Sequence, residues 1–391
     1  MSSGWVRAGL VLTTLACAGL AAGCGSASPS ASGSGAPPGR VTAGTPAVAV
    51  PLSTSLVTAQ GTWAIAVMGG PAASDNNFWQ LFVRPAGASQ WSLVTPPGVA
   101  DNGGLVAAGT GKSLVIGFRP SQDLAFSPLA TSTDTGRQWA PGLLDADLAS
   151  DPGAIAVDPS GQALALLQNG TIETAATAGA AAAGQWSELT TRPALAASAP
   201  GRDCGLLGLE AVSFGVKKTP MAVGGCQRPG VAGVFIDTSG TWRSAGLTLP
   251  AAYRGDQVRV LGLAATSGGN VALLRAGDSL LAAWSNGTGW TVSAPAAGVE
   301  SGSVRASGFG PGGSAWLLLS GGRAETVGGP GAGWQALPAV PAGTATLAPG
   351  PGGGWDALAV SGAKLTVWRL ATGAWAPVQV IKVPIEYGSS S

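Results

Sequence analysis

Hydrophobic positions along the chain fall into short runs that are separated by turns containing Gly or Pro. Seven times a Trp follows such a turn and opens a run that ends near a Pro, and these residues are Trp91, Trp139, Trp186, Trp242, Trp290, Trp334 and Trp375. Successive Trp residues lie 48, 47, 56, 48, 44 and 41 residues apart. A period of about 40–50 residues indicates that one supersecondary unit is repeated along the chain.

Each period contains three further hydrophobic runs before its Trp. In the sixth period, residues 304–309, 315–319 and 323–327 precede the run 334–337. Four short strands per period are the pattern of a propeller blade. The sequence therefore predicts an all-β, seven-bladed β-propeller with four antiparallel strands per blade, spanning residues 47–388.

The repeat also makes local predictions. Residues 178–183 are rich in Ala, the best helix former, but the repeat register and the neighbouring Gly residues predict that no helix forms there. Residues 48–52 and 380–385 are additional to the four strands of each unit, so we expect them to pair with one another or with the outer edge of the last blade. One Trp per repeat predicts an anchor in the seam between blades; a row of sugar-stacking Trp residues is the functional alternative.

The N-terminus has the pattern of an export signal. Arg7 precedes an apolar run, residues 8–22, that is too short to span a bilayer as a helix. The stretch Leu20-Ala21-Ala22-Gly23-Cys24 resembles the lipobox of bacterial lipoproteins, which implies lipidation of Cys24 after removal of residues 1–23; Ala21 departs from that pattern. Residues 24–46, rich in Gly, Ser, Ala and Pro, then predict a flexible tether to the outer face of the cytoplasmic membrane. Ordinary cleavage and secretion is the alternative.

The cysteine count agrees with export. Cys17 lies in the signal peptide and Cys24 in the lipobox, so Cys204 and Cys226 remain in the folded part. Two cysteines in an oxidising compartment predict one disulfide, and two structural thiols are the alternative.

Charge and composition exclude several classes of function. The chain has no His, which excludes Ser/His/Asp, Cys/His and His-ligated metal mechanisms, and we expect neither a metal nor a cofactor. Residues 24–391 carry 19 basic and 19 acidic residues, so a nucleic acid partner is not expected, nor is membrane contact other than through the lipid. We expect a monomer. The bias to Ala, Gly, Pro and Arg is typical of a high-GC, actinobacterial-type coding sequence.

One turn carries a more specific motif. Ser132, Asp134, Gly136 and Trp139 match S-x-D-x-G-x-x-W, and residues 237–242 look like a degenerate copy. The chain thus resembles the Asp-box, or BNR-repeat, propellers of the sialidase-like superfamily. In that superfamily the box is a folding element that lies away from the ligand, so the resemblance implies a structural role for Asp134 rather than a catalytic one.

Candidate binding residues come from the loops that a propeller of this strand order places on one face. These loops carry mixed Arg and Asp residues, which suits a polar binding site on a rigid scaffold, although loops hold charges in any protein. We single out Arg119, Arg202, Arg228, Tyr253 and Arg254, because Arg makes bidentate contacts with carboxylates and Tyr adds amphipathic area.

Three functions follow as hypotheses. The first is a non-enzymatic binding or scaffold module for a protein, a cell-wall glycan or a small ligand. The second is a sialidase-like glycoside hydrolase at the cell surface, but the set of family residues is incomplete: Phe118-Arg119-Pro120 lacks the Ile of the family motif. We therefore assign no catalytic residue. The third is an assembly or quality-control factor for a membrane complex.

Overall fold

The structure is a computed structural model, and it describes residues 53–69, 77–96, 105–111, 113–118, 126–149, 153–266, 268–287, 289–298 and 304–384. The chain divides into two units, Met1–Thr45 and Pro46–Ser391, and all of the described residues belong to the second. The signal peptide, Cys24, the tether and residues 48–52 lie outside the described residues, so these predictions stay predictions. Within the described ranges no helix is long and apolar enough to cross a membrane.

Short antiparallel strands follow one another along the chain as the hydrophobic runs predict. The first three groups are β1–β4 (Ser53–Thr58, Gly61–Gly69, Asn77–Pro85, Ser92–Leu93), β5–β8 (Leu105–Thr110, Ser113–Phe118, Ser127–Ser132, Ala140–Leu144) and β9–β12 (Ile155–Val157, Ala163–Leu166, Thr171–Ala175, Ser187–Thr191). The next two are β13–β17 (Leu206–Phe214, Pro220–Cys226, Val231–Thr238, Thr241–Ser244, Leu247–Thr248) and β18–β21 (Val258–Thr266, Gly269–Ala276, Ser279–Ser285, Trp290–Val292). The last two are β22–β25 (Val304–Phe309, Ala315–Leu319, Ala324–Val327, Gln335–Ala336) and β26–β29 (Thr344–Pro349, Trp355–Ser361, Lys364–Ala371, Ala374–Lys382).

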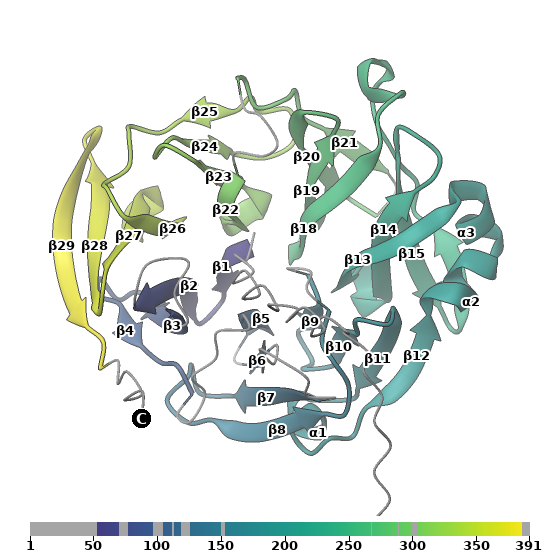
Figure 1. The fold of residues 1–391 in the computed structure, drawn as a ribbon, viewed down its shortest axis with the longest axis horizontal. Helices are drawn as coiled ribbons and strands as arrows, with labels where there is room; N and C mark the ends of the chain where they lie inside the picture. The colour runs from purple at the N-terminus through teal and green to yellow at the C-terminus, as the bar shows by residue number, and fades with distance from the viewer. Residues whose placement is uncertain are drawn as a thin grey trace, which may run out of the picture. The chain divides into compact units, whose positions relative to one another are not determined.

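These groups form an all-β propeller, which confirms the predicted fold class. Consecutive strands within each group pair antiparallel, except that β17 pairs with β15 rather than with β16. The strands β1, β5, β9, β13, β18, β22 and β26 lie nearest the centre (Figure 1). The parallel pairing of β1 with β22 joins two groups into one eight-stranded sheet. Because of this joining, the number of seven blades stays a prediction.

The hydrophobic core lies between neighbouring sheets. Alternate residues of a strand point to opposite faces, so each sheet offers one apolar face to the sheet before it and one to the sheet after it. Val258 and Val260 of β18, for example, share a buried cluster with Met221 of β14 and Val234 of β15. Each sheet is therefore stabilised mainly by its two neighbours, as the repeat period implies.

Three of the repeat Trp residues, Trp290, Trp334 and Trp375, join neighbouring sheets. The indole Nε1 of Trp290 donates to the backbone oxygen of Ala245 at 3.1 Å, that of Trp334 to Ala294 at 3.1 Å, and that of Trp375 to Pro338 at 3.1 Å. Each acceptor follows the outer strand of the preceding sheet. These contacts support the interpretation of the Trp repeat as a structural anchor.

The structure corrects two local predictions. Residues Ala178–Ala182 form helix α1, because the Thr177 side chain accepts a hydrogen bond from the Ala180 amide as an N-cap and Ala is the best helix former. The connection before β13 also holds two short helices, α2 (Arg192–Ala197) and α3 (Ala199–Cys204).

Residues 380–382 are not a separate closure strand, since they continue β29 and pair with β28. Four 3₁₀ turns complete the described elements: Val216–Lys218, Ala251–Tyr253, Pro311–Gly313 and Pro351–Gly353.

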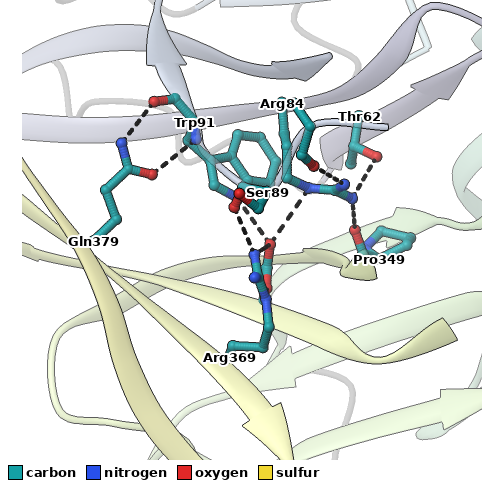
Figure 2. A network of polar contacts seen from close by, with 9 residues as sticks. Thr62, Arg84, Ser89, Trp91, Pro349, Arg369 and Gln379 are labelled. Carbon is teal, nitrogen blue, oxygen red and sulfur yellow. Dashed lines mark hydrogen bonds and ion pairs between the residues drawn. The ribbon is translucent and has the colours of Figure 1, made fainter. Parts of the chain in front are cut away.

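Side chains hold the first group of strands against the last. Asp356 of β27 is fully buried and accepts hydrogen bonds from Trp91 Nε1 at 2.9 Å and from Arg369 Nε at 2.8 Å. Arg84 Nε of β3 lies 3.5 Å from the same carboxylate, and Arg84 Nη2 donates to the Pro349 backbone oxygen at 2.7 Å (Figure 2). Burial lowers the pKa of Arg84, and the nearby Asp356 acts in the opposite direction.

Gln379 of β29 extends this network. Its side chain accepts from the Trp91 backbone amide and donates to the Trp91 backbone oxygen, each at 2.8 Å, as a paired strand would (Figure 2). The seam between the two ends of the described chain is thus closed by polar side chains around one buried carboxylate, a contact that strand patterning does not reveal.

Candidate binding site

Four of the five predicted binding residues lie on connections that the structure brings together. Arg202 lies on α3, Arg228 on the turn between β14 and β15, and Tyr253 and Arg254 on the connection between β17 and β18. The fifth, Arg119, lies outside the described residues. We call residues 199–205, 227–230 and 249–257 together the stapled surface, because covalent and hydrogen bonds fix them to one another.

A disulfide forms the first link of the stapled surface. Cys204 at the end of α3 is bonded to Cys226 at the end of β14, which confirms the predicted pairing. The turn after β14 is fixed to the same segment, since the Gln227 amide donates to the Gly205 oxygen at 2.8 Å and the Arg228 amide to the Cys204 oxygen at 3.2 Å. The end of α3 and the β14–β15 turn therefore hold one arrangement.

Backbone hydrogen bonds add the third segment. The Gly230 amide donates to the Asp256 oxygen at 2.7 Å, and the Leu249 amide donates to the Gly230 oxygen at 2.8 Å. Gly230 has φ +70°, and a Cβ at this position would lie 2.7 Å from the Arg254 Cα. Only glycine fits such a close approach at positive φ. The Gln257 side chain completes the link by donating to the Gln227 backbone oxygen at 3.2 Å.

Local sequence explains the two helices beside the disulfide. Thr191 and Ser198 are N-caps whose side chains accept hydrogen bonds from Ala194 and Gly201 amides, and each helix has Pro in its first turn. Gly205 ends α3 in the left-handed conformation at φ 66°. These capping signals place Cys204 at a defined helix end, next to Cys226.

The arginines of the stapled surface are available to a ligand. Arg228 and Arg254 are exposed, and among the described residues neither side chain has a hydrogen bond or an ion pair. Arg202 is exposed and donates to the backbone oxygen of Ala197. Tyr253 is half-buried and packs against the core between the β13–β17 and β18–β21 sheets. The surface therefore offers two exposed cations, Arg228 and Arg254, that have no partner among the described residues and lie on a fixed backbone.

Sequence reasoning missed a charged pair beside this surface. Glu210 of β13 is buried, and it accepts hydrogen bonds from the Val260 amide at 2.7 Å and from Arg259 Nε. Both charged residues interrupt apolar strands that lie nearest the centre of the propeller. That interruption was the signal that could have identified them, whereas the candidates chosen from the sequence came from loops alone.

The Asp-box residues build a turn rather than a site. Ser132 Oγ donates to Asp134 Oδ1 at 2.9 Å and accepts from the Gly136 amide at 2.9 Å, while the Gln138 amide donates to Asp134 Oδ1 at 3.0 Å. These donors, the Gln138 amide above all, lower the pKa of Asp134. All of the carboxylate's described contacts are local to the turn between β7 and β8.

Three acidic residues gather where the β5–β8 and β9–β12 sheets meet. Glu173 of β11 lies opposite Glu188 of β12 in the strand register. Burial raises the pKa of Glu173, and the charges of Glu188 and Asp145 raise it further. Within the described ranges no group of three His, Cys, Asp or Glu residues is placed to hold a metal ion.

Comparison with known proteins identifies the fold. No family model matches the chain, and no curated protein matches it. Among solved structures, a GH74 xyloglucanase from Xanthomonas campestris is similar with TM-score 0.53 and 17% identity, covering 85% of this chain and 54% of that one. A Bacteroides fragilis protein proposed to be a 6-phosphogluconolactonase has TM-score 0.53 and 11% identity, covering 83% and 96%. The chain thus spans about half the length of the xyloglucanase.

These structural similarities show the β-propeller fold and do not show a family or an activity. At such identities they do not carry an activity over, and they give no support for the sialidase-like superfamily in particular. The class of protein defined by the fold and the site is a β-propeller with a disulfide-fixed loop surface.

Proposed function

We propose that this chain is a lipid-anchored, extracytoplasmic β-propeller that acts as a non-enzymatic binding module through its stapled surface. The observation that carries the proposal is the fixation of exposed, unpaired arginines by the Cys204–Cys226 disulfide and the hydrogen bonds around it. Loops that are ordered before binding lose less conformational entropy when a ligand arrives. The stapled surface carries three arginines against two aspartates, Asp203 and Asp256, and fixed loops with such an excess of arginine suit recognition of an acidic partner.

The export part of the proposal rests on the N-terminal sequence and on the disulfide. Disulfides persist in oxidising compartments, in agreement with a signal peptide and lipobox that deliver the chain across the membrane. The test compares the wild-type chain with Cys24→Ala by membrane fractionation. We expect the wild-type chain in the membrane fraction, and we expect the variant to be released or left unprocessed. A wild-type chain that is recovered in the soluble fraction would contradict anchoring.

The binding part is tested by sedimentation with isolated cell envelopes from the source bacterium. The full-length Cys24→Ala chain is compared with the same chain carrying Arg228→Ala and Arg254→Ala. The control is Arg137→Ala on the turn between β7 and β8, which removes an exposed arginine outside the stapled surface. The paired substitution is expected to reduce the bound fraction about 10-fold or more, because charged hydrogen bonds contribute about 1.5–3 kcal/mol each. Equal loss with Arg137→Ala would contradict binding through the stapled surface.

A further inference from the structure

Glu210 and Arg259 form a charged pair at the centre-facing end of the stapled surface. Glu210 is the extra residue of a β-bulge, since the pairing of β13 with β14 shifts between Leu209 and Ala211. Bulges change the direction of a side chain and are common beside functional sites. Here the bulge lets a carboxylate of β13 reach β18, which lies next to β13 near the centre of the propeller (Figure 1).

The carboxylate of Glu210 fixes the arginine along one edge of its guanidinium. β18 pairs with β19 on one side only, and on its other side Glu210 accepts from the Val260 amide at 2.7 Å. The same carboxylate accepts from Arg259 Nε. Glu210 is 6% exposed and Arg259 is 57% exposed. The buried Glu210 carboxylate thus fixes the Nε side of the exposed Arg259 guanidinium.

The outer part of this guanidinium is open. Neither Nη1 nor Nη2 of Arg259 has a hydrogen bond to any described residue. These two nitrogens form the planar fork that binds two oxygens of one oxyanion. Because Nε is already held, the fork is oriented before a ligand arrives, and less side-chain entropy is lost on binding.

A second arginine lies beside the pair. Arg275 of β19 lies directly opposite Arg259 in the strand register, and it has no hydrogen bond or ion pair among the described residues. Like charges directly opposite on paired strands are destabilising. The ion pair with Glu210 compensates the charge of Arg259. A bound anion would compensate that of Arg275.

This pair is continuous with the stapled surface. A Cβ at Gly225 would lie 3.9 Å from the Arg259 Cδ, and Gly225 directly precedes the disulfide residue Cys226. Gln257, two residues before Arg259, donates to the Gln227 backbone oxygen. One ligand can therefore reach the stapled loops and the Arg259 fork together.

We propose that Arg259 binds the oxyanion of a ligand and that Glu210 is its positioning residue. The chemical class is a ligand bearing a carboxylate or phosphate group, with the two oxygens of that group on Nη1 and Nη2 and the charge of Arg275 adding attraction. The proposal rests on the proposed binding function, and it names the chemistry that the ligand must present.

The test titrates acetate and inorganic phosphate, as separate arms, into the full-length chain and follows the Val260 backbone amide signal by NMR, together with the Arg259 Nε–H signal in chains that keep Arg259. A single charged fork predicts a dissociation constant of about 1–10 mM for such small probes. Arg259→Met and Arg259→Lys are expected to weaken binding about 10-fold or more, because lysine keeps the charge and loses the fork. The arm that binds more tightly identifies the group that the natural ligand carries.

Arg305→Met is the matched control. Arg305 is also exposed and is likewise the second residue of a centre-facing strand, β22, but it has no carboxylate partner among the described residues. Its replacement is expected to change the affinity less than about 2-fold, since an exposed charge that does not contact the anion is weakened by water and salt. An equal loss in Arg305→Met would mean that general positive charge, rather than the fork, attracts the anion, and would overturn the proposal.

Glu210→Gln tests the positioning role. It is expected to shift the Arg259 Nε–H signal in the ligand-free chain and to weaken the binding of both acetate and phosphate about 10-fold. The urea midpoint of the variant shows whether the fold is kept. A folded Glu210→Gln chain with wild-type affinity, or no binding of either anion at about 50 mM, would refute the inference. If envelope binding still depends on Arg228 and Arg254 in that case, the proposed function stands without it.

Discussion

Neutralising Asp356 is expected to destabilise the propeller by opening its seam between the first and last groups of strands. Asp356 is fully buried and is the shared acceptor for Trp91, Arg369 and Arg84. Asp356→Asn keeps the size of the side chain, so it removes the charge without creating a cavity. The effect measured is then the loss of charge compensation together with the hydrogen bonds that one carboxylate oxygen accepts, because an amide nitrogen donates instead.

The magnitude follows from the burial of the partners. The Arg84 side chain is 8% exposed and that of Arg369 is 21% exposed, so neither cation is well hydrated once the carboxylate is gone. Removing one partner of a buried ion pair costs about 3–5 kcal/mol, a large part of the usual 5–15 kcal/mol of a folded domain. The pKa of Arg84, already lowered by burial, would fall further without the carboxylate beside it.

The assay is urea unfolding followed by Trp fluorescence. Glu325→Gln is the matched control, since Glu325 is also buried, but its partner Arg323 is 44% exposed and keeps hydrogen bonds to the Ala297 and Gly298 oxygens. We expect the control to cost about 1 kcal/mol. Adding Arg84→Met to Asp356→Asn should recover part of the loss by removing the unpaired cation. Equal losses in the two single variants would refute the reasoning.

Three further outcomes are expected. Glu173→Gln should stabilise the chain at pH 7, because the raised pKa of Glu173 means that its ionised form is disfavoured in the fold. This gain in the free energy of unfolding should vanish below the pKa of the unfolded chain, about 4.3, and urea midpoints measured at pH 7 and below that pKa check it. Replacing Cys204 and Cys226 by Ala should lower the free energy of unfolding by about 3 kcal/mol for a 22-residue separation, and in the wild-type chain neither thiol should be alkylated before reduction. Asp134→Ala should destabilise the chain at pH 7 but not change anion binding; since the pKa of Asp134 is lowered, the difference in urea midpoint should shrink as pH falls through that pKa.

The sequence predicted the fold class because the signals of a propeller are local. Each unit buries its two faces against its neighbours, so the same turn, strand and Trp signals recur at nearly constant spacing. The hydrogen bonds of Trp290, Trp334 and Trp375 to the preceding sheet show why one Trp per period was enough to find the repeat. The Cys204–Cys226 disulfide was predicted for a simpler reason, since no other cysteines lie in the folded part.

The features that the sequence did not predict depend on contacts between distant residues. Arg84 and Asp356 are 272 positions apart, and nothing in either strand's pattern says that they meet. Glu210 and Arg259 are closer in sequence, but their contact requires a bulge in β13. The helix at residues 178–182 was missed for the opposite reason: local propensity and an N-cap prevailed over the repeat register.

The proposed export and the proposed binding both depend on the Cys204–Cys226 disulfide. The stapled surface keeps its arrangement by a disulfide, which is stable outside the cytosol and rare inside it. In a reducing compartment the end of α3 and the β14–β15 turn would be held only by non-covalent contacts, the hydrogen bonds of the Gln227 and Arg228 amides and the pairing of β13 with β14, and about 3 kcal/mol of constraint would be lost. The loops bearing Arg202, Arg228 and Arg254 would then lose more conformational entropy when a ligand binds, and the affinity would be lower. The signal peptide and the cysteine pair, although far apart in the sequence, thus support the same proposal: a surface whose binding geometry depends on the compartment in which it works.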